Sequence, residues 1–322
     1  MSNLPNPIAT RDALLQERGW TLLSVFDTNA HEPFKDVSRV RTATGAERIL
    51  RIGERRPPEF FPNGYSGTHI VIPKLHESSE DPCFELEELL PGTLLSAIEP
   101  VPTAHMFVRP DLLTECIEGF WELSWMFPTQ PLAPKWRREE KLLKHFAGAR
   151  TLLTAEEHHR IMCVLMATQD FWNSTHAAKW KYSLDNIILL PDQRLGLIDL
   201  ARVGTYFWGY DLGWLLWSRW FHLPLEALQH PEMHLRAIER YFAQIIALAP
   251  SGETQLPHGA PHHLHHRLAL VLLERIIGAF FDVAESIAHT RSTLATPERR
   301  DAFVAFLHAL LAWTLPRCTG RS

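Results

Sequence analysis

The pattern of apolar residues changes at Pro91-Gly92, and this change limits the folds that the chain can adopt. Before that point, apolar residues come in short or alternating runs separated by turn residues, which is typical of antiparallel strands. The Thr-Gly pair in RTATGAERIL predicts a hairpin turn between two of them, and Thr10 is expected to cap a short helix that runs to about Arg18. The runs expected to form strands are WTLLSVF, VSRVRTA, RILRIG, HIVIPKL and CFELEELL.

After Pro91-Gly92, apolar residues recur at the helical period. Thr154 and Glu157 have the spacing of a capping box, ahead of a helix running towards His176. Thr296, followed by a proline, predicts another helix start. One segment departs from this pattern, since NIILL, PDQ and RLGLID predict two short strands joined by a turn.

Together these patterns predict an α+β fold with two lobes. A small, antiparallel β-rich lobe is expected over residues 1–92, and a large, mainly helical lobe that carries the internal hairpin is expected over residues 93–322. The length of 322 residues suits such an arrangement, and a composition that is 46% hydrophobic supplies a sizeable core.

Charge and cysteine content narrow the class of protein. The net charge of −5 and the scattered basic residues argue against a nucleic-acid binder. The four cysteines lie at positions 83, 116, 163 and 318, too far apart for a CxxC metal or redox motif, so a reducing compartment and hence a cytoplasmic location are expected. We expect no membrane span and no signal peptide, because the chain has neither a long apolar run nor a basic, apolar N-terminus.

The segment over residues 176–216 carries the most specific pattern. It contains Asp185-Asn186-Ile187-Ile188-Leu189, then Leu197-Ile198-Asp199, then Tyr210-Asp211-Leu212, with a hairpin between Asn186 and Asp199. This order and spacing resemble the catalytic region of the aminoglycoside phosphotransferase and choline kinase superfamily, whose members have a protein-kinase-like fold. The resemblance covers roughly residues 10–222 and implies the two-lobed fold described above.

The resemblance also implies a nucleotide site. Asn186 and Asp199 stand where the family holds Mg²⁺, and Arg51 stands where it places a phosphate-binding basic residue. Glu87 and Leu89 lie in the segment that would meet the adenine edge, so ATP and Mg²⁺ are the implied cofactors. A purely structural alternative is that Asn186 and Asp199 cap the turns on either side of the hairpin.

The position of the family's catalytic aspartate, five residues before Asn186, holds Lys181. An ammonium group cannot accept a proton at neutral pH unless its pKa is strongly depressed, so Lys181 is a poor substitute base. It can instead attract phosphate or pair with Asp199. The family's histidine two residues earlier is replaced as well, by Lys179.

Two further departures concern the small lobe. The loop DTNAHEPFKDVS, where the family covers the phosphates, contains no glycine, although glycine lets a backbone approach phosphate closely. The segment ERRPPEFFPNGYSG replaces a helix whose glutamate pairs with the basic residue, and its prolines oppose a helix. Glu54 or Glu59 is the candidate partner for Arg51 there.

We therefore favour a kinase-fold protein with impaired catalysis, similar to a pseudokinase, that retains nucleotide–Mg²⁺ binding and acts by binding a small molecule or a protein partner. One alternative is an active ATP-dependent phosphotransferase for a small hydroxyl- or amine-bearing molecule. Others are a nucleotidyl transferase with the same fold and a non-enzymatic interaction scaffold. Four tryptophans, Trp208, Trp214, Trp217 and Trp220, follow the Asp199 strand. Trp214 and Trp217, with Phe221, fit one helical face and are expected to form core, with an aromatic cage for a quaternary ammonium group as the alternative.

Overall fold

The computed structural model falls into two compact units. The first contains Met1–Leu94 and Asn186–Val203, and the second contains Leu95–Asp185 and Gly204–Ser322. The internal hairpin thus groups with the first unit, whereas the sequence pattern assigns it to the second lobe; the domains 1–92 and 93–322 stay a prediction. The residues that the structure describes are 6–26, 35–58, 60–98, 109–125, 138–173, 176–179, 181–218, 220–251, 261–285, 294 and 296–319.

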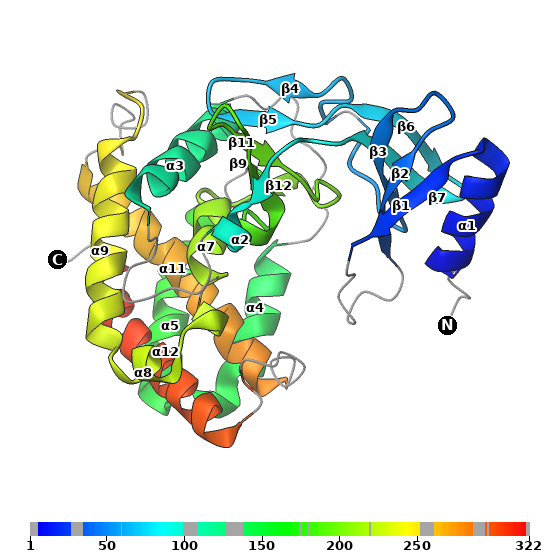
Figure 1. Cartoon of the computed structure of the whole chain (residues 1–322). Helices are drawn as coiled ribbons and strands as arrows, with labels where there is room; N and C mark the ends of the chain where they lie inside the picture. The colour runs from blue at the N-terminus through cyan, green and yellow to red at the C-terminus, as the bar shows by residue number, and fades with distance from the viewer. Residues whose placement is uncertain are drawn as a thin grey trace. The chain divides into compact units, whose positions relative to one another are not determined.

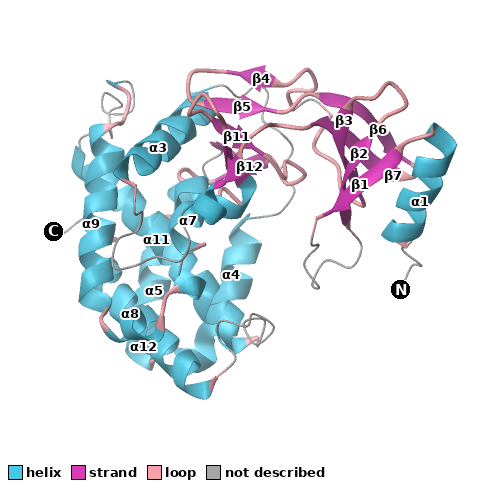
Figure 2. Cartoon of the chain, viewed as in Figure 1, coloured by secondary structure: helices cyan, strands magenta, loops and turns pink. Residues whose placement is uncertain are grey.

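The first unit contains a five-stranded, fully antiparallel sheet in the order β1-β2-β3-β7-β6 (Figure 2). Its strands are β1 (Thr21–Val25), β2 (Asp36–Arg41), β3 (Glu47–Ile52), β6 (Leu75–Glu80) and β7 (Cys83–Glu88). Alternation along β3 and β7 sends apolar side chains to one face, where they form a small buried core. That core consists of Leu14, Val40, Leu50, Ile52, Phe84 and Leu86.

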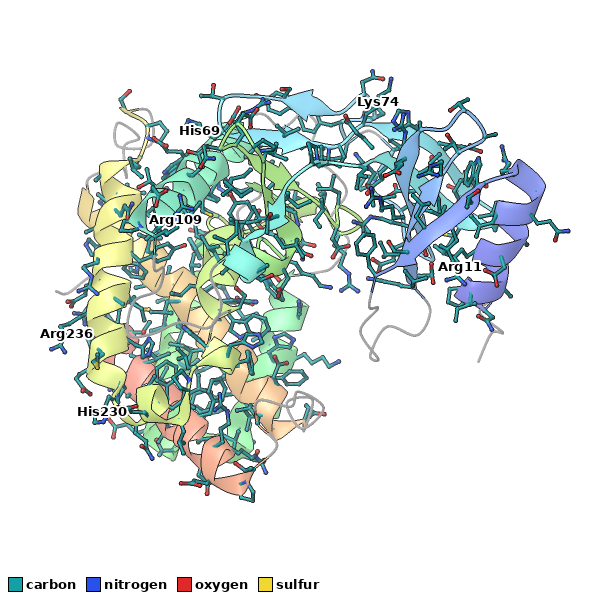
Figure 3. The ribbon with its side chains drawn as sticks, in the orientation of Figure 1. Arg11, His69, Lys74, Arg109, His230 and Arg236 are labelled. Carbon is teal, nitrogen blue, oxygen red and sulfur yellow. The ribbon has the colours of Figure 1, made fainter. Side chains whose placement is uncertain are left out.

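Helix α1 (Pro7–Arg18), drawn in blue in Figure 1, contributes Leu14 to this core. The cap is Asn6, four residues before the expected cap Thr10, and its side chain accepts from backbone N–H groups of the first turn. Arg11, labelled in Figure 3, fixes α1 to the sheet through an ion pair of 2.9 Å with the buried Asp36.

A second sheet of the first unit contains the hairpin. Its order is β4-β5-β11-β10-β8. The hairpin strands pair antiparallel as expected, and β5 joins β11 in parallel. The strands are β4 (Tyr65–Ser66), β5 (Ile70–Ile72), β8 (Thr93–Leu94), β10 (Ile187–Leu189) and β11 (Leu195–Leu197).

The run HIVIPKL does not form one strand as the sequence predicts. Pro73 separates β5 from β6, and the two strands belong to different sheets. Proline has no backbone N–H and restricts the residue before it, so it interrupts a ladder. The proline-rich segment between β3 and β4 contains no helix among its described residues, as its composition predicts.

The second unit is mainly helical. Helix α11 (Pro261–Ala284) packs against α4, α7, α9 and α12, and most of its described side chains are buried. A two-stranded sheet joins β9 (His176–Ala178) to β12 (Gly204–Tyr206). No helix among the described residues is long and apolar enough to cross a membrane. The other α-helices are α2 (Leu95–Ile98), α3 (Pro110–Trp125), α4 (Arg138–Ala149), α5 (Ala155–Ala167), α6 (Gln169–Asn173), α7 (Tyr210–Trp217), α8 (Leu225–Gln229), α9 (Pro231–Ala247) and α12 (Pro297–Arg317).

Both helix starts that the sequence predicts in this unit are confirmed. Thr154 and Glu157 form the capping box at the start of α5, and the Thr296 side chain accepts from the backbone of Arg299 at the start of α12. Helix α5 ends at Ala167 rather than near His176, which instead begins β9.

Candidate nucleotide and metal site

Arg51 on β3 is held by a carboxylate from the neighbouring strand of its own sheet. Its Nε donates to Glu87 Oε2 on β7 at 2.8 Å. In the register of the two strands, Arg51 lies opposite Glu85 and Ile49 opposite Glu87, so these side chains share one face of the sheet. The Arg51 side chain is 13% exposed and that of Glu87 only 2%, so the contact is an internal ion pair.

A second arginine completes this cluster. The Arg56 side chain is fully buried; one of its terminal nitrogens donates to Glu87, and the other donates to the carbonyl oxygen of Pro73 at 2.9 Å. The backbone N–H of Arg56 donates to Glu85 Oε1 at 2.6 Å. Two buried arginine side chains thus share one glutamate, which neutralises charges that would be costly to bury alone.

The two glutamates of this cluster have opposite pKa shifts. Burial raises the pKa of Glu87, but the adjacent guanidinium groups of Arg51 and Arg56 outweigh burial and hold that pKa below its usual value. For Glu85, burial and repulsion from Glu87 prevail over the arginines and raise the pKa to about 7. Glu87 is therefore the ionised partner of the arginines.

Asn186 and Asp199 lie at the same end of the hairpin. Strand β10 begins directly after Asn186, β11 ends two residues before Asp199, and the backbone N–H of Ile198 donates to the Asn186 carbonyl at 3.2 Å. An Asp199 carboxylate oxygen lies 3.9 Å from the Arg51 guanidinium. The basic residue and the two candidate metal ligands therefore all belong to the first unit.

The donor set of Asn186 and Asp199 fits Mg²⁺, which takes hard oxygen ligands. One residue offers an amide carbonyl and the other a carboxylate, and the Asp199 side chain is 22% exposed, so an ion from solvent can reach it. Asp199 also has a φ of 57°. A left-handed backbone at a residue other than glycine is costly and is often found at functional sites.

Lys181 also has a left-handed backbone, with a φ of 53°. Its carbonyl accepts from Ser183 N–H at 2.7 Å and from the buried Lys179 ammonium at 3.4 Å. The Lys179 backbone N–H donates to Asp211, a buried carboxylate at the start of α7, at 2.6 Å. Asp211 therefore braces this segment. Since Lys181 belongs to the second unit, an ion pair with Asp199 stays a prediction.

Of the two glutamates expected to pair with Arg51, one has other partners and the other lies outside the described residues. Glu54 pairs with Lys35 at 2.6 Å and with Arg202 at 3.4 Å. The carboxylate that pairs with Arg51 is instead that of Glu87 on β7. Glu59 and residues 27–34 of the glycine-free loop lie outside the described residues.

Glu87 has a different environment from the one that the sequence suggests. Its carboxylate faces the buried arginines, so its side chain is committed to the cluster rather than free for adenine. Leu89 is half-buried in the connection that follows β7. The cluster members that sequence reasoning missed are Glu85 and Arg56. The pattern Glu-Leu-Glu within an apolar strand is a usable sign, because buried carboxylates at alternate positions require basic partners.

The aromatic residues after the hairpin already hold a cation of the chain itself. The Arg275 guanidinium lies over the rings of Tyr210, Trp214 and Trp217, at 5.0, 5.2 and 5.8 Å from their centroids, and pairs with the adjacent buried Glu274. This arrangement supports core packing as the role of these rings.

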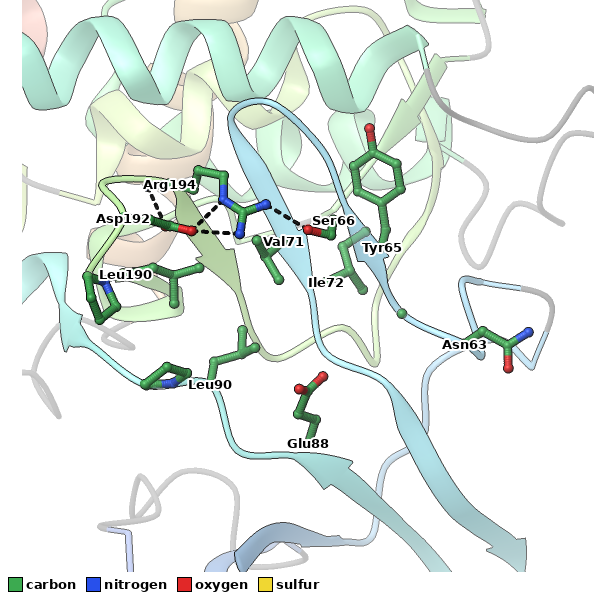
Figure 4. Close-up of a pocket in the computed structure, with 13 residues that line it drawn as sticks. Asn63, Tyr65, Ser66, Val71, Ile72, Glu88, Leu90, Leu190, Asp192 and Arg194 are labelled. Atoms are coloured by element: carbon green, nitrogen blue, oxygen red, sulfur yellow. Dashed lines mark hydrogen bonds and ion pairs between the residues drawn. The ribbon is translucent and has the colours of Figure 1, made fainter.

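A pocket of about 550 Å³ opens on the first unit (Figure 4). Glu88 at the end of β7, with Leu90 and Pro91 in the connection that follows, forms one side, and the turn of the β10–β11 hairpin forms another. In that turn, Arg194 donates to Asp192 at 2.8 Å and to the Ser66 hydroxyl at 2.7 Å. Arg51, Asn186 and Asp199 do not line it, so this pocket is separate from the cluster described above.

Comparison with known proteins identifies the fold. No protein-family model and no curated protein matches the sequence. Among solved structures, the choline kinase LicA from Streptococcus pneumoniae has a TM-score of 0.54 at 10% identity, covering 95% of this chain and 98% of LicA. The macrolide 2′-phosphotransferase MphH from Brachybacterium faecium has a TM-score of 0.51 at 12% identity, covering 94% and 98%.

The aminoglycoside phosphotransferase APH(4)-Ia has a TM-score of 0.50 at 12% identity, covering 97% of each chain. The chain therefore has the two-lobed, protein-kinase-like fold of choline kinases and antibiotic phosphotransferases. The predicted fold class is confirmed, and so is the resemblance at the level of fold.

Proposed function

We propose that this kinase-fold protein binds a nucleotide and Mg²⁺ and is impaired in phosphoryl transfer. One observation supports nucleotide binding above all. Glu87 orients the Arg51 guanidinium through a hydrogen bond of 2.8 Å, and an Asp199 carboxylate oxygen lies 3.9 Å from the same guanidinium. A fixed guanidinium can bind phosphate oxygens, and an adjacent carboxylate and amide suit the metal that accompanies them. Leu89 and the backbone of its segment would meet the base.

Impaired transfer is supported by Lys181. Phosphoryl transfer depends on positioning and on charge neutralisation, with a carboxylate that orients the acceptor hydroxyl. Lys181 supplies a positive charge where the resemblance places that carboxylate. When Mg²⁺ is bound, it neutralises charge on the phosphates; Asn186 and Asp199 would hold it and Arg51 would orient a phosphate.

Structures with the same fold contain nucleotides. LicA has been solved with AMP, and a thermostable mutant of APH(4)-Ia has been solved with ADP and hygromycin B. These complexes support a nucleotide as the ligand of this chain. A cytoplasmic location agrees with the four cysteines, all of which are free thiols.

A thermal-shift titration with ATP, with and without Mg²⁺, tests the nucleotide site on wild type and Asp199→Ala. ATP at a hundred times its dissociation constant stabilises the fold by about 2.7 kcal/mol. We expect a shift that needs Mg²⁺ and is lost in Asp199→Ala, and Asp192→Ala, in the hairpin turn, serves as the matched control that keeps it. The absence of a shift in wild type would reject nucleotide binding and favour the interaction scaffold.

The second candidate is an active phosphotransferase for a small hydroxyl- or amine-bearing molecule. The retained set of Arg51, Asn186 and Asp199 favours it, because a largely dissociative transition state makes a missing base less costly. A substrate screen that finds ATP consumption dependent on Asp199 would establish it. A covalent AMP adduct on a target would instead indicate the nucleotidyl transferase.

A further inference from the structure

One exposed face of α5 carries a thiol, an imidazole and a guanidinium. His159, Arg160 and Cys163 are all exposed, and their spacings of three and four residues place them together on the helix surface. Cys163 Sγ lies 3.7 Å from His159 Nε2, within hydrogen-bond distance for sulfur. An imidazole at this distance can accept the proton of the thiol.

These side chains line a pocket of about 510 Å³ in the second unit. The opposite wall is formed by His266 on α11 and by the end of α12 with the residues that follow it, including Leu315, Cys318 and Thr319. His266 Nε2 lies 2.7 Å from the Cys318 carbonyl, which joins these two parts of the wall. The volume is in the range that holds small organic ligands.

The other three cysteines have environments that oppose reaction. Cys116 and Cys318 are buried, and burial raises the pKa of the Cys318 thiol far above its usual value. Cys83 is half-buried, and burial raises its pKa too. Since the thiolate is the nucleophile, these three thiols react slowly, and Cys163 is the exposed one with an imidazole beside it.

We propose that Cys163 and its pocket form a modification site for small disulfides that carry carboxylates, of which glutathione disulfide is an example. His159 accepts the thiol proton, and the Cys163 thiolate attacks one sulfur of the disulfide. A new S–S bond forms to Cys163 while the old one breaks, and the departing thiolate takes up a proton. Cys163 is oxidised to a disulfide, and the departing sulfur of the incoming disulfide is reduced to a thiol, so the electrons balance. Arg160 offers a cation for a carboxylate of the incoming disulfide.

Intact-mass measurement of the full chain with glutathione disulfide, followed by peptide mapping, tests the site. We expect one adduct, on Cys163, that is absent from Cys163→Ser and present in the matched control Cys83→Ser. His159→Gln should slow the adduct several-fold, because it removes the imidazole that lies 3.7 Å from the thiol and accepts its proton. All of these positions are exposed or half-buried, so the variants should fold, and circular dichroism checks that they do.

A second disulfide distinguishes the role of Arg160 in binding a carboxylate from the reaction at the Cys163 thiol. Hydroxyethyl disulfide carries no carboxylate, so Arg160→Gln should slow the reaction with glutathione disulfide several-fold more than the reaction with hydroxyethyl disulfide. First labelling at Cys83, or an unchanged rate in His159→Gln, would overturn the proposal. Equal slowing with both disulfides would overturn the assignment of a carboxylate-bearing ligand.

Discussion

Arg51 and Glu87 form a 2.8 Å ion pair between neighbouring strands of one sheet. The resemblance implies a partner on a helix after β3, but the described part of that segment contains no helix. The orientation of Arg51 therefore depends on the β3–β7 ladder and not on the position of a separate element. A basic residue fixed in this way is oriented before any ligand arrives, so less ordering is needed on binding.

Replacing Glu87 with glutamine should strongly destabilise the first unit. The change leaves two largely buried guanidinium groups, of Arg51 and Arg56, without their shared carboxylate. Breaking a buried ion pair by removing one partner costs about 3–5 kcal/mol. Urea denaturation measures the loss. The matched control is Glu88→Gln, because Glu88 is the exposed neighbour on the same strand and should change stability by less than about 0.5 kcal/mol. Equal effects of both variants would contradict this role for Glu87.

Glu85 should make the stability of the protein depend on pH. Its pKa is raised from the usual 4.5 to about 7, mainly by burial. The folded chain therefore keeps this proton up to about pH 7, whereas the unfolded chain releases it near 4.5, so this contribution to stability is complete below 4.5 and is lost as pH rises through 7. Glu85→Gln cannot ionise and keeps an acceptor for the Arg56 N–H.

Relative to wild type, Glu85→Gln should gain about 2 kcal/mol more stability at pH 8 than at pH 5. Urea denaturation at the two pH values gives this difference directly, with Glu88→Gln as the control at an exposed position of the same strand. If Glu85→Gln and wild type differ by the same amount at both pH values, Glu85 does not release its proton between them in the folded state.

Most of the helices and strands could be predicted, because each of them depends on residues that are close together in the sequence. The apolar runs around β1, β2, β3 and β7, the hairpin of β10 and β11, and the caps at Thr154 and Thr296 are all fixed by neighbours in sequence. The pairing of β5 with β11 joins Ile70 to Leu195, and no local pattern specifies a contact between positions so distant.

The same limit applies to the candidate site. Asn186 and Asp199 are predicted because they belong to a spaced pattern, and Arg51 is predicted from the position that the resemblance implies. Arg56 could not be predicted, because its contact with Glu87 depends on the path of an irregular, proline-rich segment that the sequence does not specify. The role of Glu87 as an internal partner also depends on the register of β3 with β7, which only the structure gives.

Lys181→Asp should raise Mg²⁺-dependent release of phosphate from ATP. A positioned general base contributes about a hundredfold or more. The backbone at position 181 is left-handed, and aspartate tolerates this conformation better than lysine, so the substitution should not add strain. Radiolabelled ATP measures the rate without knowledge of the acceptor. Lys181→Asn is the matched control, because it has the same shape without the charge. A wild type as fast as Lys181→Asp would reject impaired catalysis.

Gly92→Ala should cost far more stability than the same change at another left-handed glycine. Gly92 has a φ of 144°, and an added Cβ would lie 2.2 Å from the Leu189 carbonyl oxygen on β10. This oxygen belongs to the backbone of β10, which pairs with β8. It can therefore move only if the β8–β10 pairing shifts. Steric overlap and backbone strain together should cost about 3 kcal/mol or more.

Gly45 provides the control for Gly92. It also has a positive φ, of 85°, but no heavy atom lies within 4 Å of the position of its Cβ. Gly45→Ala therefore adds backbone strain alone and should cost about 1 kcal/mol. Urea denaturation of the two variants separates the two effects. Equal costs would mean that the steric contact at position 92 does not affect stability. A larger cost for Gly92→Ala would show that a side chain is excluded there, because the chain crosses at this point from one sheet of the first unit to the other and passes close to β10.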